Sequence, residues 1–318
     1  MDPIALAAER LQAADACHDE DPQRGAALLR EIDPVALDPG QRPLYAYLLN
    51  HVLAEKLGQP GEAWQRQQAL LAAAGAEAPL PLLRHAGAAA HLAGDLAGET
   101  RLTARLADVA DTPLVQAAEL MALAAASFEV PALRGDLAGE AALAALAPLH
   151  AAAWQHGSGL DAAAGALTNN IASDLAERPL TELASRPLRH ALAQAATLAQ
   201  GLWRRAGQWV QHERAHYLRA VVANALGEAA EAESQARAGL VLIANFDRSG
   251  QETVDRAFLL SELAHALARL GRIAEAEVER AQADAIADAF DDPGLVSWYR
   301  RRVARQAELD QALTAPIA

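Results

Sequence analysis

A short glycine-containing phrase recurs along this chain and constrains its fold more than any other feature. The pattern Leu-Gly-x-x-x-Glu-Ala occurs at residues 57–63, 226–232 and 270–276. A related phrase, Gly-Asp-Leu-Ala-Gly-Glu, occurs at 94–99 and 135–140. Each phrase lies between two Ala-rich apolar stretches. Because glycine ends helices and acidic residues favour helix starts, each phrase predicts a tight corner between two helices.

The apolar residues have the spacing and the identity typical of helices. Leu260, Leu263, Leu267 and Leu270 form one stripe at helical spacing, which ends at Gly271. Hydrophobic residues make up 52% of the chain but aromatics only 4%, so alanine and leucine dominate the predicted core. Alanine has the highest helix propensity, and no stretch alternates as a strand would. The sequence predicts an all-helical fold.

The corners divide the chain into an array of helix pairs. Five corners lie at glycines, with two glycine-less corners near Arg178 and at residues 18–22. The spacings are roughly 36 to 49 residues and give about seven antiparallel pairs. The stretch 292–313 begins at a proline and predicts a C-terminal capping helix. We expect a single domain over residues 1–318, with a possible subdivision near 157–160.

These corners resemble those of the tetratricopeptide-repeat family, in a divergent form with long repeats. The resemblance rests on the turn glycine, the Glu-Ala four and five positions later, and small residues in the flanking helices. It is clearest at residues 214–242, 258–287 and 44–74. The repeats exceed the usual 34 residues, and residues 131–189 are degenerate. The resemblance implies a right-handed α-solenoid.

In the resembled family the first helix of each pair lines a concave groove that binds peptides. The positions carried over from the family are mostly polar residues on otherwise apolar helices. They are Tyr45, Glu55, Lys56, Arg84, His85, His91, Thr168, Asn169, Arg214, Tyr217, Asn224, Ser261, Glu262, His265 and Arg269.

The charge balance limits the classes of partner that the chain is expected to bind. The chain carries 27 basic and 41 acidic residues, for a net charge of −14. General binding to nucleic acid or to an anionic membrane needs a positive surface, so neither is expected. The first residues lack a basic segment followed by an apolar run. We therefore expect a cytoplasmic protein without a membrane span and without a cofactor.

One motif points to an alternative function in catalysis. His212-Glu213-Arg214-Ala215-His216 matches H-E-x-x-H, which on a helix places two imidazoles for Zn²⁺ and a glutamate as general base. The third ligand that such sites need would have to come from Glu228, Glu231 or Glu233. A zinc-dependent hydrolase using His212 and His216 as metal ligands therefore stays open.

Two further patterns could bind metals. Glu213-x-x-His216 and Glu262-x-x-His265 resemble the paired motifs of di-iron bundles, but their different offsets from the corners disfavour convergence. The stretch 17–21, Cys-His-Asp-Glu-Asp, is rich in ligand atoms yet falls at a predicted corner, where acidic residues are expected.

The sequence favours a non-catalytic scaffold that binds a protein or peptide segment in the groove of a helical array. The zinc hydrolase is the first alternative, and a regulator that senses a peptide or metabolite is the second.

Overall fold

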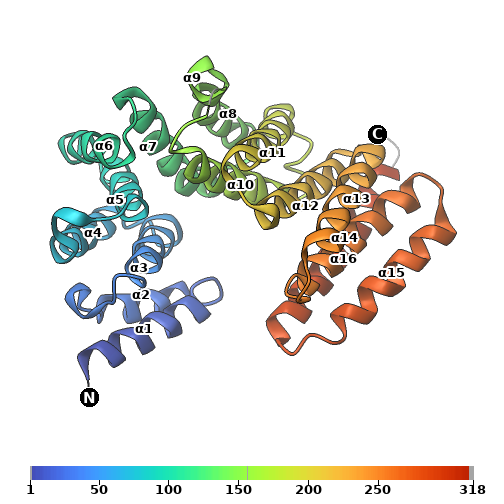
Figure 1. Cartoon of the computed structure of the whole chain (residues 1–318), viewed down its shortest axis with the longest axis horizontal. Helices are drawn as coiled ribbons and strands as arrows, with labels where there is room; N and C mark the ends of the chain where they lie inside the picture. Colours follow the sequence, from blue (N-terminus) through green and yellow to red (C-terminus); the bar gives the residue numbers. More distant parts are fainter. Residues whose placement is uncertain (1, 156, 315–318) are drawn as a thin grey trace. The chain divides into compact units, whose positions relative to one another are not determined.

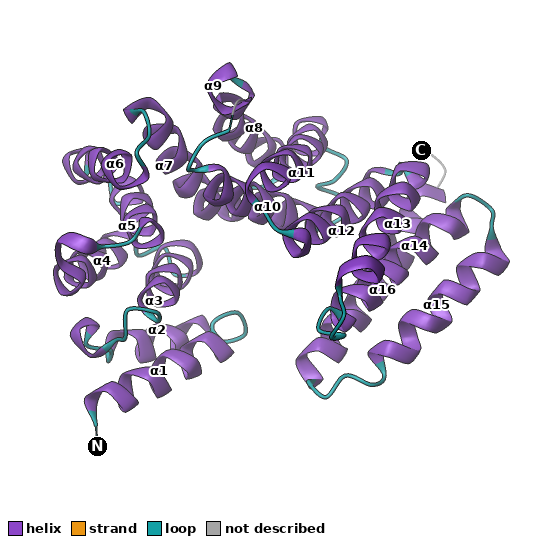
Figure 2. Cartoon of the chain, viewed as in Figure 1, coloured by secondary structure: helices purple, strands orange, loops and turns teal. Residues whose placement is uncertain are grey.

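The chain is helical, as the sequence predicts. The computed structural model describes residues 2–155 and 157–314, and within these ranges it contains helices, turns and loops but no strand (Figures 1 and 2). The chain divides into two compact units, Met1–Leu167 and Thr168–Ala318. The division falls within the helix α10 (Asp161–Ala176).

Unit 1 consists of helices joined by short turns. Its α-helices are α1 (Pro3–Cys17), α2 (Pro22–Arg30), α3 (Arg42–Leu48), α4 (Pro60–Ala74), α5 (Leu80–Leu92), α6 (Leu96–Ala110), α7 (Leu114–Glu129), α8 (Gly135–Leu146) and α9 (Ala152–Gln155). Short 3₁₀ segments are η1 (Pro34–Ala36), η3 (Gly75–Glu77), η4 (Val130–Ala132) and η5 (Ala147–His150).

Helix α3 continues directly into η2 (Leu49–Lys56), which is a π-helical segment. The N–H of Leu57 donates to the carbonyl of Val52, five residues earlier, at 3.1 Å. A π-turn is wider than an α-turn, so it rotates the residues before it relative to those after it. Such segments are rare and occur frequently at functional sites.

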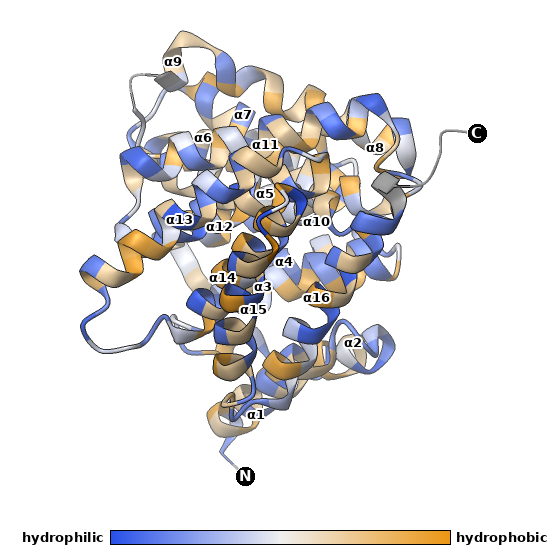
Figure 3. Ribbon diagram, turned by 90° about the vertical axis from the view of Figure 1, so that its right-hand side faces the viewer, coloured by the Kyte–Doolittle hydropathy of each residue, from blue (hydrophilic) through white to orange (hydrophobic). Residues whose placement is uncertain are grey.

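Helices of unit 1 pack on their neighbours and on alternate helices. α1 packs on α2, η2 on α4, α5 on α6, and α7 on α8, while α5 also packs on α3 and α7. A Cβ at Gly87 would clash with Sδ of the buried Met121, so the missing side chain allows α5 and α7 to approach closely. The hydropathy colouring of Figure 3 shows apolar and polar residues alternating along single helices, as amphipathic helices require.

One stretch of the described chain, residues 114–132 of α7 and η4, has the length and apolar composition to cross a membrane. More than half of it, 56%, is buried inside the structure, where Leu120, Leu123 and Ala124 are part of the core. A buried core helix has the same composition as a membrane-spanning helix, so this stretch is only weak evidence for a membrane span.

Unit 2 repeats this pattern with longer helices. They are α11 (Arg186–Ala206), α12 (Trp209–Leu226), α13 (Ala229–Phe246), α14 (Thr253–Arg269), α15 (Ile273–Ala287) and α16 (Pro293–Thr314). Each helix from α11 to α14 packs on the next one, α12 also packs on α14, and α16 packs on both α14 and α15. The core between α12, α13 and α14 is formed by apolar side chains such as Leu259, Leu263 and Leu267. A helix over residues 293–314 confirms the predicted C-terminal helix.

The glycines that mark the predicted corners have left-handed backbone conformations. Gly58, Gly94, Gly135, Gly227 and Gly271 have φ between +55° and +88°. Only glycine adopts this region without a steric penalty. The corner phrase therefore predicts the turns because each turn needs a residue with a left-handed backbone conformation, and glycine supplies it.

We expect Gly271→Ala to destabilise the protein by about 1–2 kcal/mol, the cost of placing a side chain in the left-handed region. A Cβ there would meet no atom within 4 Å, so the effect would come from the backbone alone. Gly201, inside α11, also faces open space but has a helical backbone, so Gly201→Ala should stabilise by about 0.5–1 kcal/mol. Urea unfolding of both variants measures the two changes in the free energy of unfolding. Changes of the same sign and size would contradict the prediction.

Candidate functional site

A cluster of aromatic and imidazole rings joins three helices of unit 1. Tyr47 of α3 stacks on His51 of η2 at 5.4 Å between ring centroids. The Tyr47 ring also lies 6.1 Å from His85 of α5 and 6.2 Å from Phe128 of α7. Because α3 and α7 both pack on α5, the four rings form one contiguous set of contacts, which we name the ring cluster; His85 and Phe128 are buried, and Tyr47 and His51 are half-buried.

Two hydrogen-bond donors of the ring cluster have no acceptor. Nη2 of Arg84 lies 3.3 Å from Nε2 of His85, and guanidinium groups only donate. Nε2 of His85 is then the acceptor, and its proton is on Nδ1. Both Nδ1 of His85 and Nε of Arg84 are buried without a hydrogen-bond partner. Buried donors normally have partners, so this pair favours an acceptor supplied by a ligand.

The pKa values of Arg84 and His85 are consistent with the lack of a neighbouring carboxylate. Burial lowers the pKa of Arg84, and no neighbouring carboxylate raises it again. Burial, together with the charge of Arg84, holds the pKa of His85 well below its usual value, so His85 is neutral at pH 7. Arg84 makes no ion pair with the described residues, which leaves a positive charge without a counterion at the edge of the ring cluster.

The other predicted groove residues of unit 1 have different surroundings, and one of them belongs to the core. Glu55 accepts a hydrogen bond from His51, Lys56 is exposed, and His91 pairs with Glu99 at 3.0 Å. Tyr45, however, is fully buried, and its hydroxyl donates to a backbone carbonyl of α2 at 3.2 Å. It therefore belongs to the core.

Sequence reasoning missed Tyr47, His51 and Phe128. Counting back from Gly58 at α-helical spacing selects Tyr45, because the count takes no account of the wider turn of η2. The residue that contacts the neighbouring helices is Tyr47, two positions later. A histidine–tyrosine pair at i, i+4 was the signal in the sequence that could have indicated it.

In unit 2, four of the nine predicted groove residues are buried at the contact between α14 and α16. Asn224, Ser261, Glu262 and His265 are at most 3% exposed. Gln306 of α16 shares hydrogen bonds with Ser261 at 3.2 Å and with Glu262 at 2.9 Å. The expected exposure of these four residues is not found. Ser261, Glu262 and His265 bond to the C-terminal helix, and Asn224 bonds to Glu262.

The centre of this contact is a fully buried ion pair. Arg302 donates two hydrogen bonds to Glu262, at 2.6 and 3.0 Å. Asn224 of α12 donates a third at 2.8 Å. Burial alone would raise the pKa of Glu262, but the charge and hydrogen bonds of Arg302 outweigh it, so the pKa is lowered. Both groups are therefore charged, and they fasten α16 to α14.

The remaining predicted residues of unit 2 have mixed surroundings. Thr168 of α10 is buried and Asn169 is half-buried. Tyr217 contacts Phe258 edge-on at 6.0 Å between centroids. Arg214 is exposed, while Arg269 donates to the backbone carbonyl of residue 224 at 3.3 Å.

The H-E-x-x-H residues bond to different neighbours. His212 lies 3.0 Å from the carbonyl oxygen of Trp203, and Nδ1 of His216 lies 2.6 Å from the side-chain oxygen of Gln235. Within the described residues, no third metal-ligating side chain groups with both imidazoles. Glu213 and Glu262 bond to separate neighbours as well, so the geometry favours neither a zinc site nor a di-iron site at these motifs.

Glu213 instead faces two other acids. Its side chain is fully buried, and its carboxylate lies with those of Glu252 and Asp255 within 4.8 Å. Burial, followed by repulsion from Asp255, raises the pKa of Glu213 to about 9. Neither of its oxygens has a donor partner, but a proton on Glu213 would itself bond to Asp255. Arg214 pairs with Asp255 at 2.9 Å and Glu252 at 3.2 Å, which offsets part of the repulsion.

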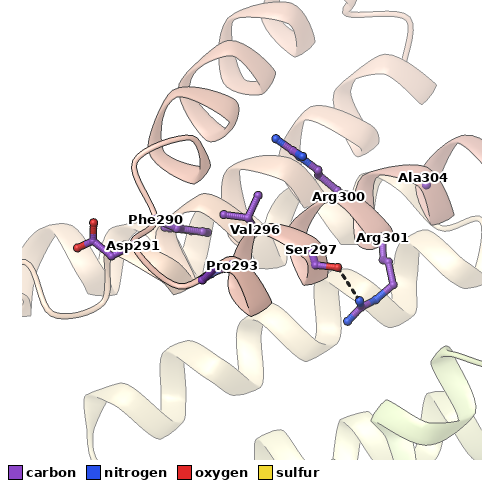
Figure 4. A pocket seen from close by; sticks show the side chains of 8 residues that line it. All are labelled: Phe290, Asp291, Pro293, Val296, Ser297, Arg300, Arg301 and Ala304. Atoms are coloured by element: carbon purple, nitrogen blue, oxygen red, sulfur yellow. Dashed lines mark hydrogen bonds between the residues drawn. The ribbon is translucent and has the colours of Figure 1, made fainter. Parts of the chain in front are cut away.

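A shallow cleft of about 610 Å³ lies at the start of α16. Figure 4 shows its lining side chains: Phe290, Asp291, Pro293, Val296, Ser297, Arg300, Arg301 and Ala304. Arg301 donates to the hydroxyl of Ser297 at 2.9 Å. No buried unpartnered polar atom of the described residues is aimed into the cleft, in contrast to the ring cluster.

Comparison with known proteins does not show a family for this chain. No protein-family model matches the chain, and no curated protein matches it in sequence. A solved structure, "Crystal structure of BtubC (BKLC) from P. vanneervenii", is similar over 91% of this chain and 93% of that chain. The two are 16% identical in sequence, and the TM-score is 0.43.

Proposed function

We propose that this chain is a non-catalytic scaffold that binds a protein or peptide segment. In this proposal the helix pairs form a right-handed α-solenoid of about seven pairs, like the tetratricopeptide repeats that the corners resemble. The packing of α5 on α3 and α7, and of α14 on α12 and α16, supports the proposal, because alternate helices stack in such arrays.

The observation that carries the proposal is the pair of unsatisfied donors at Arg84 and His85 beside the rings of Tyr47 and Phe128. A peptide carboxylate would accept from Arg84, and charge-assisted hydrogen bonds of this kind are strong. The half-buried ring of Tyr47 offers apolar area to an adjacent side chain. We therefore propose an acidic peptide segment that also carries an apolar side chain as the ligand of the ring cluster.

The experiment is a selection of peptides from a random display library on the intact chain. Selected peptides should be enriched in Asp or Glu next to an apolar residue. Their affinity should fall by about tenfold or more in Arg84→Ala, since hydrogen bonds to charged groups contribute about 1.5–3 kcal/mol.

Two controls separate binding from folding. Arg84→Ala should leave the melting temperature unchanged or higher, because it removes a buried charge that has no partner. Arg101 of α6 is exposed and is not part of the ring cluster, so Arg101→Ala should bind every selected peptide as the parent does. If Arg84→Ala and the parent select the same peptides with equal affinity, the ring cluster is not the binding site.

A further inference from the structure

The end of α1 and the segment η2 bring two histidines and an aspartate together in unit 1. His18, Asp19 and His51 place ligand atoms within 4.8 Å of one another. Nε2 of His18 lies 3.4 Å from one carboxylate oxygen of Asp19, and Nε2 of His51 lies 3.3 Å from the other. The two imidazole rings are 5.1 Å apart between centroids, at 75° to each other.

The outer nitrogens of both rings have acceptors. Nδ1 of His18 lies 2.5 Å from the backbone carbonyl of Asp15, and Nδ1 of His51 lies 2.8 Å from the carboxylate of Glu55. In each ring the shorter contact is the one at Nδ1, which favours the Nδ1 proton in the neutral ring and leaves Nε2 facing Asp19. Without a metal, Nε2 of His51 also lies within hydrogen-bond distance of Asp19, at 3.3 Å. Metal-ligating histidines characteristically have this arrangement, in which the second nitrogen donates to a carboxylate or a carbonyl.

The separations fit a tetrahedral ion. Nitrogen and oxygen ligands bind Zn²⁺ at about 2.0–2.2 Å, so neighbouring ligand atoms of a tetrahedral site are about 3.3–3.6 Å apart. Two distances match this range, each to a different oxygen of Asp19: 3.4 Å from His18 and 3.3 Å from His51. The three ligand atoms all lie within 4.8 Å of one another. Two imidazoles and a carboxylate suit a borderline ion such as Zn²⁺ better than Mg²⁺ or Ca²⁺, which prefer oxygen ligands.

The backbone supports the same three side chains. The site includes His51 and Glu55 of the π-helical η2, and such segments are frequent at functional sites. Gly25 of α2 lies against His18, where an added Cβ would be 3.4 Å from its Cα. The side chains of His18 and His51 are only 17% and 11% exposed, while that of Asp19 is 66% exposed. The histidines are held by packing, and the site opens to solvent at Asp19.

We propose that His18, Asp19 and His51 form a Zn²⁺ site with three protein ligands and an open fourth position. Glu55 and the carbonyl of Asp15 orient the two imidazoles. Lys56 lies 3.4 Å from Asp19 and competes with the ion for the carboxylate. This site goes beyond the proposed peptide binding and does not depend on it.

The test is a zinc titration of the full chain, purified without a histidine tag and stripped with chelator, by isothermal calorimetry. One Zn²⁺ per chain should bind at micromolar free zinc. His18→Ala and His51→Ala should each weaken binding by at least about tenfold, and Glu55→Gln, which changes only the orienting group, by about tenfold. Lys56→Gln should strengthen binding, because it removes the competing cation.

The double variant His212→Ala/His216→Ala is the matched control, because it removes two other histidines and should bind zinc as the parent does. Binding of Co²⁺ should produce the visible absorption of tetrahedral cobalt, which His51→Ala should lose. Absence of binding up to millimolar zinc would overturn the proposal. Zinc binding that survives His51→Ala but disappears in the His212/His216 variant would also overturn it.

Discussion

Replacing Arg302 by alanine is expected to destabilise the protein by about 3–5 kcal/mol, the typical cost of leaving one partner of a buried ion pair alone. Glu262 is fully buried, and Arg302 supplies two of its hydrogen bonds. Without the guanidinium, Glu262 has to remain charged in an apolar environment or take up a proton. Both alternatives raise the free energy of the folded state.

Arg302→Ala should also reverse the direction in which the stability of the folded state changes with pH. In the parent the pKa of Glu262 is below its value of 4.5 in an unfolded chain, so the pair stabilises above pH 4.5 and loses this contribution as the pH falls further. In Arg302→Ala the remaining burial raises the pKa of Glu262. Stability should then decrease as the pH rises above 4.5.

Urea unfolding at pH 5 and pH 8 measures both effects. Arg301 is the adjacent residue on α16 and is exposed, so Arg301→Ala should change stability by less than about 0.5 kcal/mol. The double variant Arg302→Met/Glu262→Gln removes both charges and should lose much less than Arg302→Ala alone. A loss below about 1 kcal/mol in Arg302→Ala would show that the ion pair does not hold α16.

The corner phrase predicted the parts of the fold that depend on local physical chemistry. A left-handed glycine and the acidic helix start after it are determined by a few neighbouring residues, and Gly227 and Gly271 have the predicted conformation. The C-terminal helix was also predicted, from the proline at its start.

Side-chain partners were less predictable, because they depend on residues far apart in the sequence. Glu262 was assigned to a groove as a polar residue on an apolar helix, and no sequence pattern connected it to Arg302. The two form one buried pair, 40 residues apart. His18 and His51 are likewise separated by 33 positions, and the π-turn of η2 that positions His51 has no simple sequence signature.

The second large effect concerns Glu213, the acid of the H-E-x-x-H motif. We expect Glu213→Gln to stabilise the protein by about 2–4 kcal/mol at pH 8, since each unit of pKa shift corresponds to about 1.4 kcal/mol. The pKa of Glu213 is about 9 in the folded chain, against 4.5 when unfolded. Between these values the folded state holds a proton that the unfolded state releases, so its contribution to stability falls as the pH rises.

Glutamine has the shape of the protonated acid and can donate to Asp255 without carrying a charge. The stability difference between Glu213→Gln and the parent should therefore be small near pH 5 and grow toward pH 8. Glu277 of α15 is exposed, so Glu277→Gln should change stability by less than about 0.5 kcal/mol at both pH values. Urea unfolding of the three proteins at pH 5 and 8 measures this.

The outcome also bears on catalysis, because a general base has to be ionised near the working pH to accept a proton from water. A glutamate kept protonated by burial and by repulsion from Asp255 cannot do so at pH 7. If Glu213→Gln instead destabilised the protein by a constant amount from pH 5 to 8, Glu213 would be an ionised, stabilising carboxylate. The zinc hydrolase would then regain its base, and the repulsion among the three acids would have to be offset by a cation other than Arg214.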